Sequence, residues 1–480
     1  MFRGTALGDS RERYVISNDL GEFAIITDSE VSSLRSGRLS QTHPRFLDFE
    51  AKGFFERPGS GGSGLEDAVL RTRKSFLLDG PSLHIFVVTL RCDHSCVYCQ
   101  VSRAPVHATG YDMSIEDADA AVDRVFESTA PALTIEFQGG EPALRFDLIR
   151  HIVGRVEGKN EGEGREVHFS LVSTLHHLTD DDLAFCRDHK IHISTSIDGA
   201  ASLHNRQRPI PGRDSWERTI AALTRARQYL GHHGVVALPT TTRAALADPR
   251  GLVDTYIELG FNSIFLRPMS PHGFARKTRK AVGYEMSEFV AFYEQVLDYL
   301  LDLNTQGQEI VEAYTVILLR HILTPFATNY MDLRSPAGAG LGVLVYNYDG
   351  IVYPADEARM AAESGDPRFA LGQVTQPLAE LLASPAMQWL SEGAVAEDLP
   401  GCRDCAFVPF CGADPVYHAT FHGDPVGDRE TSEFCQRHMG MFRILFRKLA
   451  EGNPETLKTL QAWAFGRARA EIMQTGIREI

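Results

Sequence analysis

Six short apolar segments, each separated from the next by an amphipathic stretch, constrain the fold of this chain more than any other feature. They are residues 84–90, 133–138, 167–173, 191–196, 234–240 and 262–267. The stretches between them, such as 114–128 and 216–229, place apolar residues at helical spacing. This alternation is typical of a parallel sheet covered by helices. Six units predict an α/β fold that forms a partial (β/α)6 TIM-like barrel, which leaves an opening that a closed eight-stranded barrel lacks.

Three cysteines follow the first apolar segment with the spacing CxxxCxxC: Cys92, Cys96 and Cys99. The loop after a parallel strand is where a barrel of this kind carries its chemistry. A cubane iron–sulfur cluster normally takes four cysteine ligands, so three thiolates leave one iron with an open coordination position. Taken alone, the spacing also fits a zinc loop.

Together with Tyr98 and the sequence Phe-Gln-Gly-Gly-Glu-Pro at 137–142, the three cysteines resemble the radical S-adenosylmethionine (SAM) enzymes. The resemblance implies that the open iron binds the amino and carboxylate groups of SAM. One electron from the cluster then splits the S–C5′ bond and gives a 5′-deoxyadenosyl radical. The resemblance further implies a cofactor-binding set made of Tyr98, Gly139, Gly140, Glu141, Ser196, Arg208 and Met269.

The members of this set have different expected roles. Gly139 and Gly140 lack a Cβ atom, so the backbone can approach the methionine part of SAM. Ser196 and Arg208 belong to a stretch similar to SxDGxxxxHDxxR of SPASM enzymes, in which this chain has Asn205 instead of the usual Asp. Ordinary turn chemistry is the alternative for Ser196, and core packing is the alternative for an adenine contact by Met269.

A second cysteine group lies in a Pro- and Gly-rich stretch and consists of Cys402, Cys405, Cys411 and Cys435. Four thiolates form a closed site, which fits either a zinc knuckle or an iron–sulfur cluster. The spacing CxxCxxxxxC after a radical SAM core is similar to the SPASM extension, which normally carries two auxiliary [4Fe-4S] clusters. Ala337, Ala355 and Pro415 stand where that extension has cysteines of the inner cluster. The resemblance therefore implies one auxiliary cluster and two [4Fe-4S] clusters in all.

Four regions are expected along the chain. They are a small N-terminal α+β domain (1–57), a linker and helix (58–80), the radical SAM partial barrel (81–305), and a SPASM- or twitch-like auxiliary cluster domain with C-terminal helices (306–480). Residues 13–27 predict two strands, and the Gly/Ser-rich run at 58–64 predicts a flexible linker. The first region weakly resembles winged-helix peptide-recognition modules, and a structural cap on the barrel is its alternative.

The segments 83–92 and 265–275 resemble the radical SAM maturases of the His-Xaa-Ser peptide system. This resemblance implies a ribosomally made precursor peptide as substrate, side-chain cross-linking as the reaction, and an electron donor such as flavodoxin or ferredoxin. Asp356 lies in an element similar to VYPCD and is the candidate general base, with a surface carboxylate as its alternative. A sulfatase-type maturase that forms formylglycine and a zinc-stabilised peptide-binding scaffold are the other two functions to be weighed.

Composition excludes some partners. The chain of 480 residues has 48 basic and 63 acidic side chains and a net charge of −15, which argues against a nucleic-acid partner. Its first ten residues lack the apolar core of a signal peptide, and no run is long enough to cross a bilayer, so a cytoplasmic protein without a membrane partner is expected. In that compartment the eight cysteines favour metal binding over disulfides. Cys186, on a helical pattern, is expected in the core.

Overall fold

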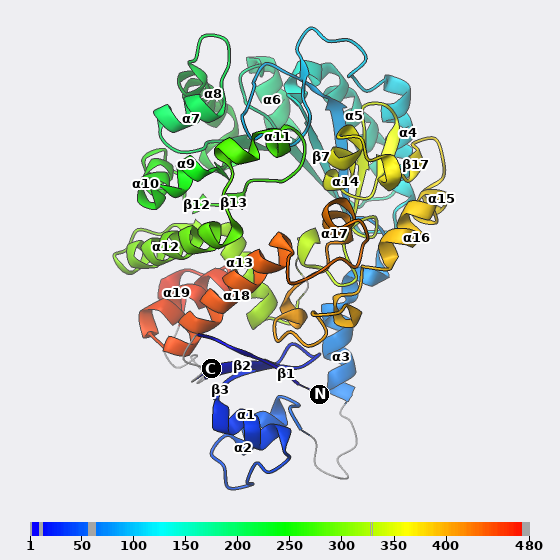
Figure 1. The fold of residues 1–480 in the computed structure, drawn as a ribbon. Coiled ribbons are helices and arrows are strands. Elements are labelled where there is room, and N and C mark those ends of the chain that lie inside the picture. The colour runs from blue at the N-terminus through cyan, green and yellow to red at the C-terminus, as the bar shows by residue number, and fades with distance from the viewer. Residues whose placement is uncertain (1, 9–12, 56–63, 327, 329, 473–480) are drawn as a thin grey trace.

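The computed structural model describes residues 2–8, 13–55, 64–326, 328 and 330–472. Most of the predicted linker at 58–64 lies outside these residues. In Figure 1 a small N-terminal unit lies at the bottom, a large sheet with its helices at the top, and the C-terminal helices between the two. Within the described residues, no helix is both long enough and apolar enough to traverse a lipid bilayer.

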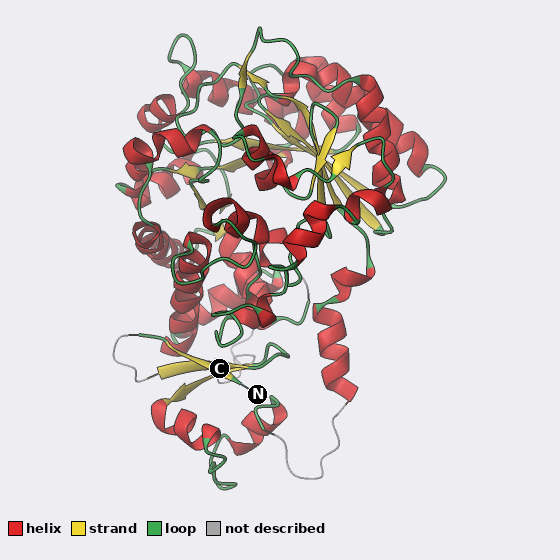
Figure 2. Ribbon diagram, turned by 45° about the vertical axis from the view of Figure 1, so that its right-hand side comes forward, coloured by secondary structure: helices red, strands yellow, loops and turns green. Residues whose placement is uncertain are grey.

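An eight-stranded, mostly parallel sheet organises the upper part of the molecule. Its strand order is β10-β9-β8-β7-β4-β15-β16-β17. The predicted strands are found as β4 (Leu83–Thr89), β7 (Ala132–Gly139), β8 (Glu166–Val172), β9 (Ile191–Ser196) and β10 (Val235–Leu238), and neighbours among them pair in parallel. Helices cover this sheet (Figure 2), and central side chains such as Phe86 and Val87 have no exposed surface. The prediction of an α/β fold with a parallel sheet is confirmed.

The sixth apolar segment is divided into two short strands. β13 (Arg267–Pro268) pairs in parallel with β11 (Thr240–Thr241), and β12 (Ser263–Ile264) pairs in parallel with β14 (Val311–Glu312). Pro239 separates β11 from β10, because proline has no N–H group to continue the ladder. The sixth segment therefore lies beside the end of the fifth strand, outside the eight-stranded sheet. Arrangement of all these strands as a partial (β/α)6 barrel stays a prediction.

The C-terminal half of the chain contributes strands to the same sheet. β15 (Val343–Tyr346) pairs in parallel with β4, and the hairpin then continues antiparallel to β16 (Ile351–Tyr353) and β17 (Gly372–Gln373). Gly350 closes this hairpin at a φ of 77°, where a side chain is disfavoured. Backbone hydrogen bonds thus join residues on the two sides of the expected boundary at 305/306, and the domain boundaries themselves stay a prediction.

The helices that cover the sheet have an apolar face toward it. Helix α4 is typical: Ser114 caps its N-terminus by accepting a hydrogen bond from Asp117 N–H, and Ala118, Ala121, Val122 and Val125 are buried along one face. Helix α3 (Gly64–Arg73) lies beside the N-terminal unit instead (Figure 1). The helices around the sheet are α4 (Ile115–Glu127), α5 (Phe146–Asn160), α6 (Asp180–Asp188), α7 (Ala201–Gln207), α8 (Ser215–Leu230), α9 (Arg243–Leu246) and α10 (Pro249–Glu258). Cys186 of α6 is fully buried in the core, as predicted.

Further helices follow toward the C-terminus, and α12 (Met286–Thr305), α18 (Glu433–Glu451) and α19 (Pro454–Phe465) lie between the sheet and the N-terminal unit (Figure 1). The others are α11 (Phe274–Val282), α13 (Ala313–Leu323), α14 (Asp356–Glu363), α15 (Leu378–Leu382), α16 (Pro385–Ser391) and α17 (Pro415–His422). Helix α18 packs along both α12 and α19.

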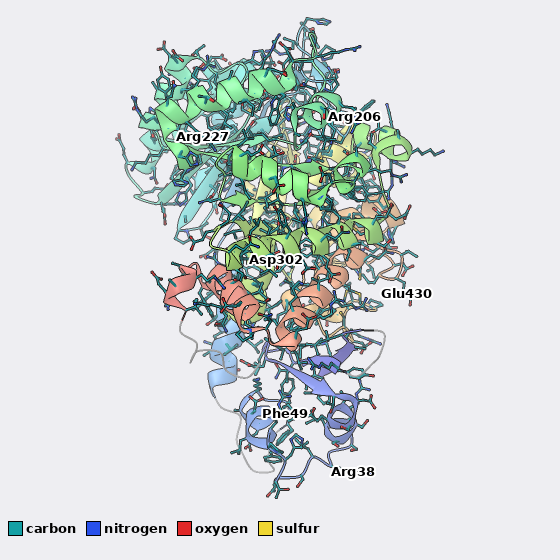
Figure 3. The ribbon with its side chains drawn as sticks, turned by 90° about the vertical axis from the view of Figure 1, so that its left-hand side faces the viewer. Arg38, Phe49, Arg206, Arg227, Asp302 and Glu430 are labelled. Carbon is teal, nitrogen blue, oxygen red and sulfur yellow. The ribbon has the colours of Figure 1, made fainter. Side chains whose placement is uncertain are left out.

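The N-terminal unit is a three-stranded antiparallel sheet with two helices. Its strands are β1 (Arg3–Ala6), β2 (Arg13–Ser17) and β3 (Phe23–Thr27), followed by α1 (Asp28–Arg35) and α2 (Phe46–Ala51). The alternation of the strands divides their side chains between two cores. Val15 and Ile25 belong to the main core, whereas Ile16 and Ile26 pack with Phe49 (labelled in Figure 3) in a small core of the unit itself.

The N-terminal sheet packs directly against the C-terminal helices. The ring of Phe23 lies 5.1 Å from that of Phe446 in α18, measured between ring centroids. The hydroxyl of Ser17 donates a hydrogen bond of 2.6 Å to the carbonyl of Ala406, beside the second cysteine group. The first and last parts of the chain therefore form one packed structure.

Candidate active site

One cavity brings together most of the residues that the sequence predicts for the cofactor site. It has a volume of ≈ 280 Å³ and lies at the carboxyl ends of β4, β7, β8, β9 and β10. The predicted residues that line it are Cys92, Cys96, Tyr98, Cys99, Gly139, Gly140, Ser196, Arg208 and Asp356. Parallel strands collect their carboxyl ends at one edge of a sheet, which explains how positions so distant in sequence share one wall.

The cysteine loop is held in place by backbone hydrogen bonds. Cys92 ends the short strand β5 (Arg91–Cys92), which pairs with β6 (Ala104–Pro105). The carbonyl of Cys99 accepts a hydrogen bond of 3.0 Å from the N–H of Ala275 in α11. Burial raises the pKa of Cys96 to about 12, so binding of a metal by this thiol releases a proton.

The two glycines are required by the packing of β7 on β4. Gly139 has a φ of 137°, and a Cβ atom on it would lie 2.0 Å from the carbonyl oxygen of Thr89. A Cβ atom on Gly140 would lie 2.4 Å from the carbonyl oxygens of Leu90 and Arg91. The glycines thus allow β7 to run against the strand that carries the cysteines, and they line the cavity at the same time.

Glu141 joins the ends of two strands and is absent from the cavity lining. It is fully buried, and its carboxylate accepts hydrogen bonds from the hydroxyl of Ser173 (2.7 Å) and from the N–H groups of Thr174 (2.7 Å) and Ala143 (3.0 Å). These bonds connect the end of β7 to the end of β8. Its predicted contact with SAM stays a prediction.

A buried hydrogen-bond network links the cysteine loop to the opposite wall. The hydroxyl of Tyr98 donates to Asp198 Oδ2 over 2.6 Å and accepts from Arg208 Nη1 over 2.8 Å. Asp198 Oδ1 also accepts the N–H of Thr240. Burial raises the pKa of Asp198, and the nearby Arg208 opposes this rise. The network orients the guanidinium of Arg208 at the cavity, where it can bind a carboxylate.

Histidines surround the aspartate that follows Cys92. Asp93 Oδ1 lies 2.8 Å from His94 Nδ1, and Asp93 Oδ2 lies 3.0 Å from His177 Nε2. Burial alone would raise the pKa of Asp93, but the hydrogen bonds from His177 and His94 outweigh it and hold the pKa below its usual range. In the described part of the chain, Cys92, Asp93 and His94 are the one group close enough to share a metal ion. The fold also brings His176 to this carboxylate, with its Nδ1 3.9 Å from Asp93 Oδ2.

Asp356 lies in the wall of the cavity. It begins α14, its side chain is 13% exposed, and its Oδ1 forms an ion pair of 3.0 Å with Nε of the fully buried Arg359. Opposite it, Glu136 and Gln138 of β7 also line the cavity. Burial, and then the charge of Asp356, raise the pKa of Glu136. Asp356 is therefore placed where a base could act, and that role stays a prediction.

Met269 lines a neighbouring cavity instead of this one. It follows β13, and its backbone N–H donates a hydrogen bond of 2.8 Å to the hydroxyl of Tyr284. The side chain is partly buried against the main core. A contact between Met269 and adenine stays a prediction.

The second group of cysteines converges on a separate cavity of ≈ 190 Å³. All four line it: Cys402, Cys405, Cys411 and Cys435. Cys435 lies in the first turn of α18, capped by Ser432, and the aromatic rings of Phe407 and Phe442 stack 5.5 Å apart beside it. Burial, and then the neighbouring Cys402, raise the pKa of Cys435 to about 11. Thr5 of β1 contributes to the same wall.

The spacing of these cysteines suits a group larger than one metal ion. A tetrahedral zinc with Zn–S bonds of about 2.3 Å places its sulfur atoms roughly 3.8 Å apart. Among the described residues, no three of the four sulfur atoms lie within 4.8 Å of one another. An iron–sulfur cluster, which spreads its ligands over several irons, fits this wider arrangement.

Comparison with known proteins assigns the sheet and its cysteine loop. Residues 86–248 match the Radical SAM superfamily. This part of the chain is a radical SAM domain. The match begins in β4, includes the three cysteines of the loop, and ends in α9. A radical SAM domain implies an enzyme, and the cavity described above is the candidate site of its chemistry.

Solved structures extend the likeness beyond the radical SAM domain. The structure is similar to anSMEcpe with bound AdoMet, with a TM-score of 0.64 and 17% identity over 77% of this chain and 98% of that chain. It is also similar to Streptococcus suis SuiB bound to its precursor peptide SuiA, with a TM-score of 0.54 and 13% identity over 91% of this chain and 98% of that chain. At these identities the likeness shows the fold.

Among curated proteins, an uncharacterized protein of Methanocaldococcus jannaschii is 35% identical over 77 residues. This match covers 16% of the present chain and 25% of the length of that relative.

Proposed function

We propose that this protein is a radical SAM maturase that cross-links side chains of a ribosomally made precursor peptide. The observation that carries the proposal is the single cavity that holds three cysteines, two glycines, Ser196, Arg208 and Asp356. The likeness to SuiB bound to a precursor peptide, and to anSMEcpe with bound AdoMet and the Kp18Cys peptide, supports a peptide as the substrate.

The cavity residues have distinct roles in this proposal. When bound, a [4Fe-4S] cluster on Cys92, Cys96 and Cys99 supplies the electron that splits SAM into methionine and a 5′-deoxyadenosyl radical. Arg208, fixed by Tyr98, binds the methionine carboxylate, and Ser196 faces the ribose or the amino-acid part. Burial at the strand ends excludes water that would quench a radical.

A cross-link removes two hydrogens from the peptide, and the proposed site has an acceptor for each. One leaves as a hydrogen atom and gives 5′-deoxyadenosine. The other leaves as a proton and an electron. Asp356, in the cavity wall, accepts the proton. The four cysteines near α18 would hold a second [4Fe-4S] cluster, which would supply an acceptor for the electron, and their wide spacing supports this.

An electron donor such as a flavodoxin or a ferredoxin is proposed to dock on α11. This helix rests on the cysteine loop, because the hydroxyl of Thr278 donates a hydrogen bond of 2.6 Å to the carbonyl of Val97. Its outer face exposes Arg276, Lys277 and Lys280, which form no ion pair among the described residues. On a chain with net charge −15, this basic face suits a partner with an acidic surface.

The unpaired state of all eight cysteines suits a reducing compartment such as the cytoplasm.

The N-terminal unit is proposed to bind the leader of the peptide. The strand order β1-β2-β3 leaves an outer edge on β3, to which an extended peptide can add as a further strand. On that edge, Arg45 Nη1 donates a hydrogen bond of 2.7 Å to the carbonyl of Ile25. A leader strand must therefore displace Arg45.

Anaerobic reconstitution tests the proposed function. About eight irons per chain are expected, since two [4Fe-4S] clusters are proposed. Replacement of Cys92, Cys96 and Cys99 by Ala should leave about four irons and abolish formation of 5′-deoxyadenosine. Zinc at the second group would contradict the auxiliary cluster.

Oxidation of a Ser or Cys residue to formylglycine is the second candidate, and the likeness to anSMEcpe with bound peptide favours it. The two reactions are distinguished by the product. Formylglycine carries an aldehyde that reacts with hydroxylamine, whereas a cross-linked peptide yields joined fragments after proteolysis and does not react.

A further inference from the structure

We propose that a second cavity, next to the cofactor cavity, binds the cationic side chain of a Lys or Arg residue in the peptide substrate. The inference rests on the proposed function, because it assumes that a peptide reaches the cofactor cavity. In this proposal, the second cavity selects the segment of the peptide that reaches the cofactor cavity.

The second cavity adjoins the first. Its volume is ≈ 100 Å³, which suits the end of one side chain. The two cavities share Gln100, Arg267 and Pro268 in their walls. Asp356 and Glu357 are consecutive in the first turn of α14, and Asp356 lines the first cavity whereas Glu357 lines the second. A side chain held in the second cavity therefore places the adjacent peptide atoms beside the first.

Carboxylates from three separate segments line the second cavity. Asp332 follows α13, Glu357 belongs to α14, and Asp414 is the N-cap of α17, where it accepts the N–H of Tyr417 at 2.9 Å. None of the three forms an ion pair within 4.0 Å in the described part of the chain. Arg437 lines the same cavity, and its Nε has no hydrogen-bond partner there. Arg267 is the other arginine in the wall, so the three carboxylates outnumber the two guanidinium groups, and their mutual repulsion is relieved when a further cation enters.

A buried histidine without a partner provides independent support. His272 lines the cavity and is 4% exposed. Neither of its ring nitrogens makes a hydrogen bond to any described residue, although the ring lies 5.1 Å from that of Phe421. Burial lowers the pKa of His272 to about 4, so the imidazole is neutral and offers one nitrogen as an acceptor. The imidazole is therefore an acceptor in the cavity wall with which an ammonium or guanidinium group can pair.

An extended organic cation fits this set better than a metal ion. The carboxylates of Asp332, Glu357 and Asp414 do not converge on one point, since the described residues hold a single group close enough to share a metal and it lies at Cys92. Lysine and arginine carry several N–H donors that can bond to separated acceptors. Tyr314, Tyr330 and Tyr417 add aromatic rings to the wall, which also attract cations.

Calorimetric titration of the reconstituted full-length protein tests the proposal. The probes are the N-acetyl methylamides of lysine, arginine and norleucine, the last of which matches lysine in length but has no charge. At least one cationic probe should bind about tenfold or more tightly than the norleucine probe, as expected for hydrogen bonds to charged groups. Equal affinities would overturn the proposal.

Two variants locate the binding site. At pH 9, where Glu357 is ionised and lysine is still a cation, Glu357→Gln and Asp332→Asn should each weaken binding of the cationic probe about tenfold, since each removes one charged acceptor. Glu430→Gln serves as the matched control, because Glu430 is exposed and outside the cavity (Figure 3). Two independent positions keep the test valid where one variant fails to fold. Unchanged affinity in both folded variants, or tight binding of Mn²⁺ that displaces the cationic probe, would overturn the proposal.

Different results would contradict the proposed function and the assignment of the second cavity. If the wild-type protein releases no 5′-deoxyadenosine from SAM, the proposed function is wrong. If it does so and yet does not distinguish the lysine and arginine probes from norleucine, the proposed function holds and the assignment of the second cavity is wrong.

Discussion

Tyr98 carries more of the active-site architecture than its place in the cysteine loop indicates. Its hydroxyl lies between Asp198 and Arg208, at 2.6 and 2.8 Å, with all three groups buried. We predict that Tyr98→Phe lowers the free energy of unfolding by about 1–3 kcal/mol, because it leaves a buried charged group without its partner. The affinity for SAM should also fall, since Arg208 loses its orientation. Chemical denaturation and a SAM titration measure the two effects.

Tyr256→Phe is the matched control for this change. The hydroxyl of Tyr256 is also buried, but it donates to a neutral acceptor, the carbonyl of Ile197, at 2.8 Å. Its loss should cost about 0.5–1.5 kcal/mol and leave SAM binding unchanged. Equal effects of the two substitutions on SAM affinity would contradict the role given to Tyr98.

Glu357 makes the stability of the fold depend on pH. Burial, and then repulsion by Asp332, raise its pKa from 4.5 to about 8. Between these two values the folded chain binds more protons at this site than the unfolded chain does, so stability falls as the pH rises. Each unit of the rise corresponds to about 1.4 kcal/mol. We predict a lower melting temperature at pH 8.5 than at pH 5.5, and a smaller difference in Glu357→Gln, which cannot ionise. Parallel pH dependences of the two proteins would refute this.

Residues near a motif were predictable from the sequence, and residues that meet only through the fold were not. The cysteines, Ser196 and Arg208 line one cavity, as the motifs indicated. Glu136 and Gln138 were missed, although they occupy alternate positions of β7, where a buried strand of a parallel sheet would otherwise be apolar. Asp332, Glu357 and Asp414 come from three segments that share no pattern, so no signal in the sequence could have joined them.

At the scale of single elements, α11 is the feature with the clearest test. We predict that the combined substitution Arg276→Glu, Lys277→Glu and Lys280→Glu slows formation of 5′-deoxyadenosine about tenfold when reduced flavodoxin is the electron source, because opposite charges speed association. Titration of flavodoxin should show a weaker complex that no longer depends on salt. Dithionite, a small reductant, needs no docking surface and should support both proteins equally.

The control for α11 carries the same change of charge at a distance from the cysteine loop. Arg35, Arg38 and Lys190 are exposed and lie on α1, in the loop after it and before β9, respectively. Their replacement by Glu should leave the flavodoxin-dependent rate unchanged. A similar loss of rate in both triple variants would show that total charge, and not the face of α11, controls the reaction.

Periodicity identified the long elements and failed for the short ones. The segments that became β4, β7, β8, β9 and β10 were found because buried strands are rich in Val, Ile and Phe. The strand β1 was missed, since Arg-Gly-Thr-Ala has no apolar alternation and pairs only because β2 lies beside it. The pairing of β15 with β4 was also missed, because strand order depends on contacts between residues that are far apart in sequence.

At the scale of the whole molecule, the N-terminal unit and the second cysteine site depend on each other. We predict that a chain starting at Leu65 loses metal from the second site. Thr5 belongs to the wall of that cavity, and the packing of Phe23 on Phe446 is removed as well. None of the residues that line the first cavity comes from this unit. About four irons should remain, and SAM cleavage without peptide should continue. Iron analysis and the yield of 5′-deoxyadenosine measure the two outcomes.

The same deletion tests leader recognition. Affinity for the full-length precursor should fall toward that for a peptide without its leader, because the edge of β3 is gone. Equal affinity with and without the unit would leave it as a structural cap. Retention of about eight irons in the shortened chain would show that the unit is dispensable for the second site.

The packing of β1 against the second cysteine group also has a consequence for synthesis of the protein. The wall of that cavity combines Thr5 with Cys435, which is translated much later. The match to the Radical SAM superfamily, by contrast, covers residues 86–248 and has Cys92, Cys96 and Cys99 near its start. Assembly of the two metal sites is therefore ordered in time: the three cysteines of the first site are synthesised before any cysteine of the second, whose cavity wall is complete only after Cys435 has been made.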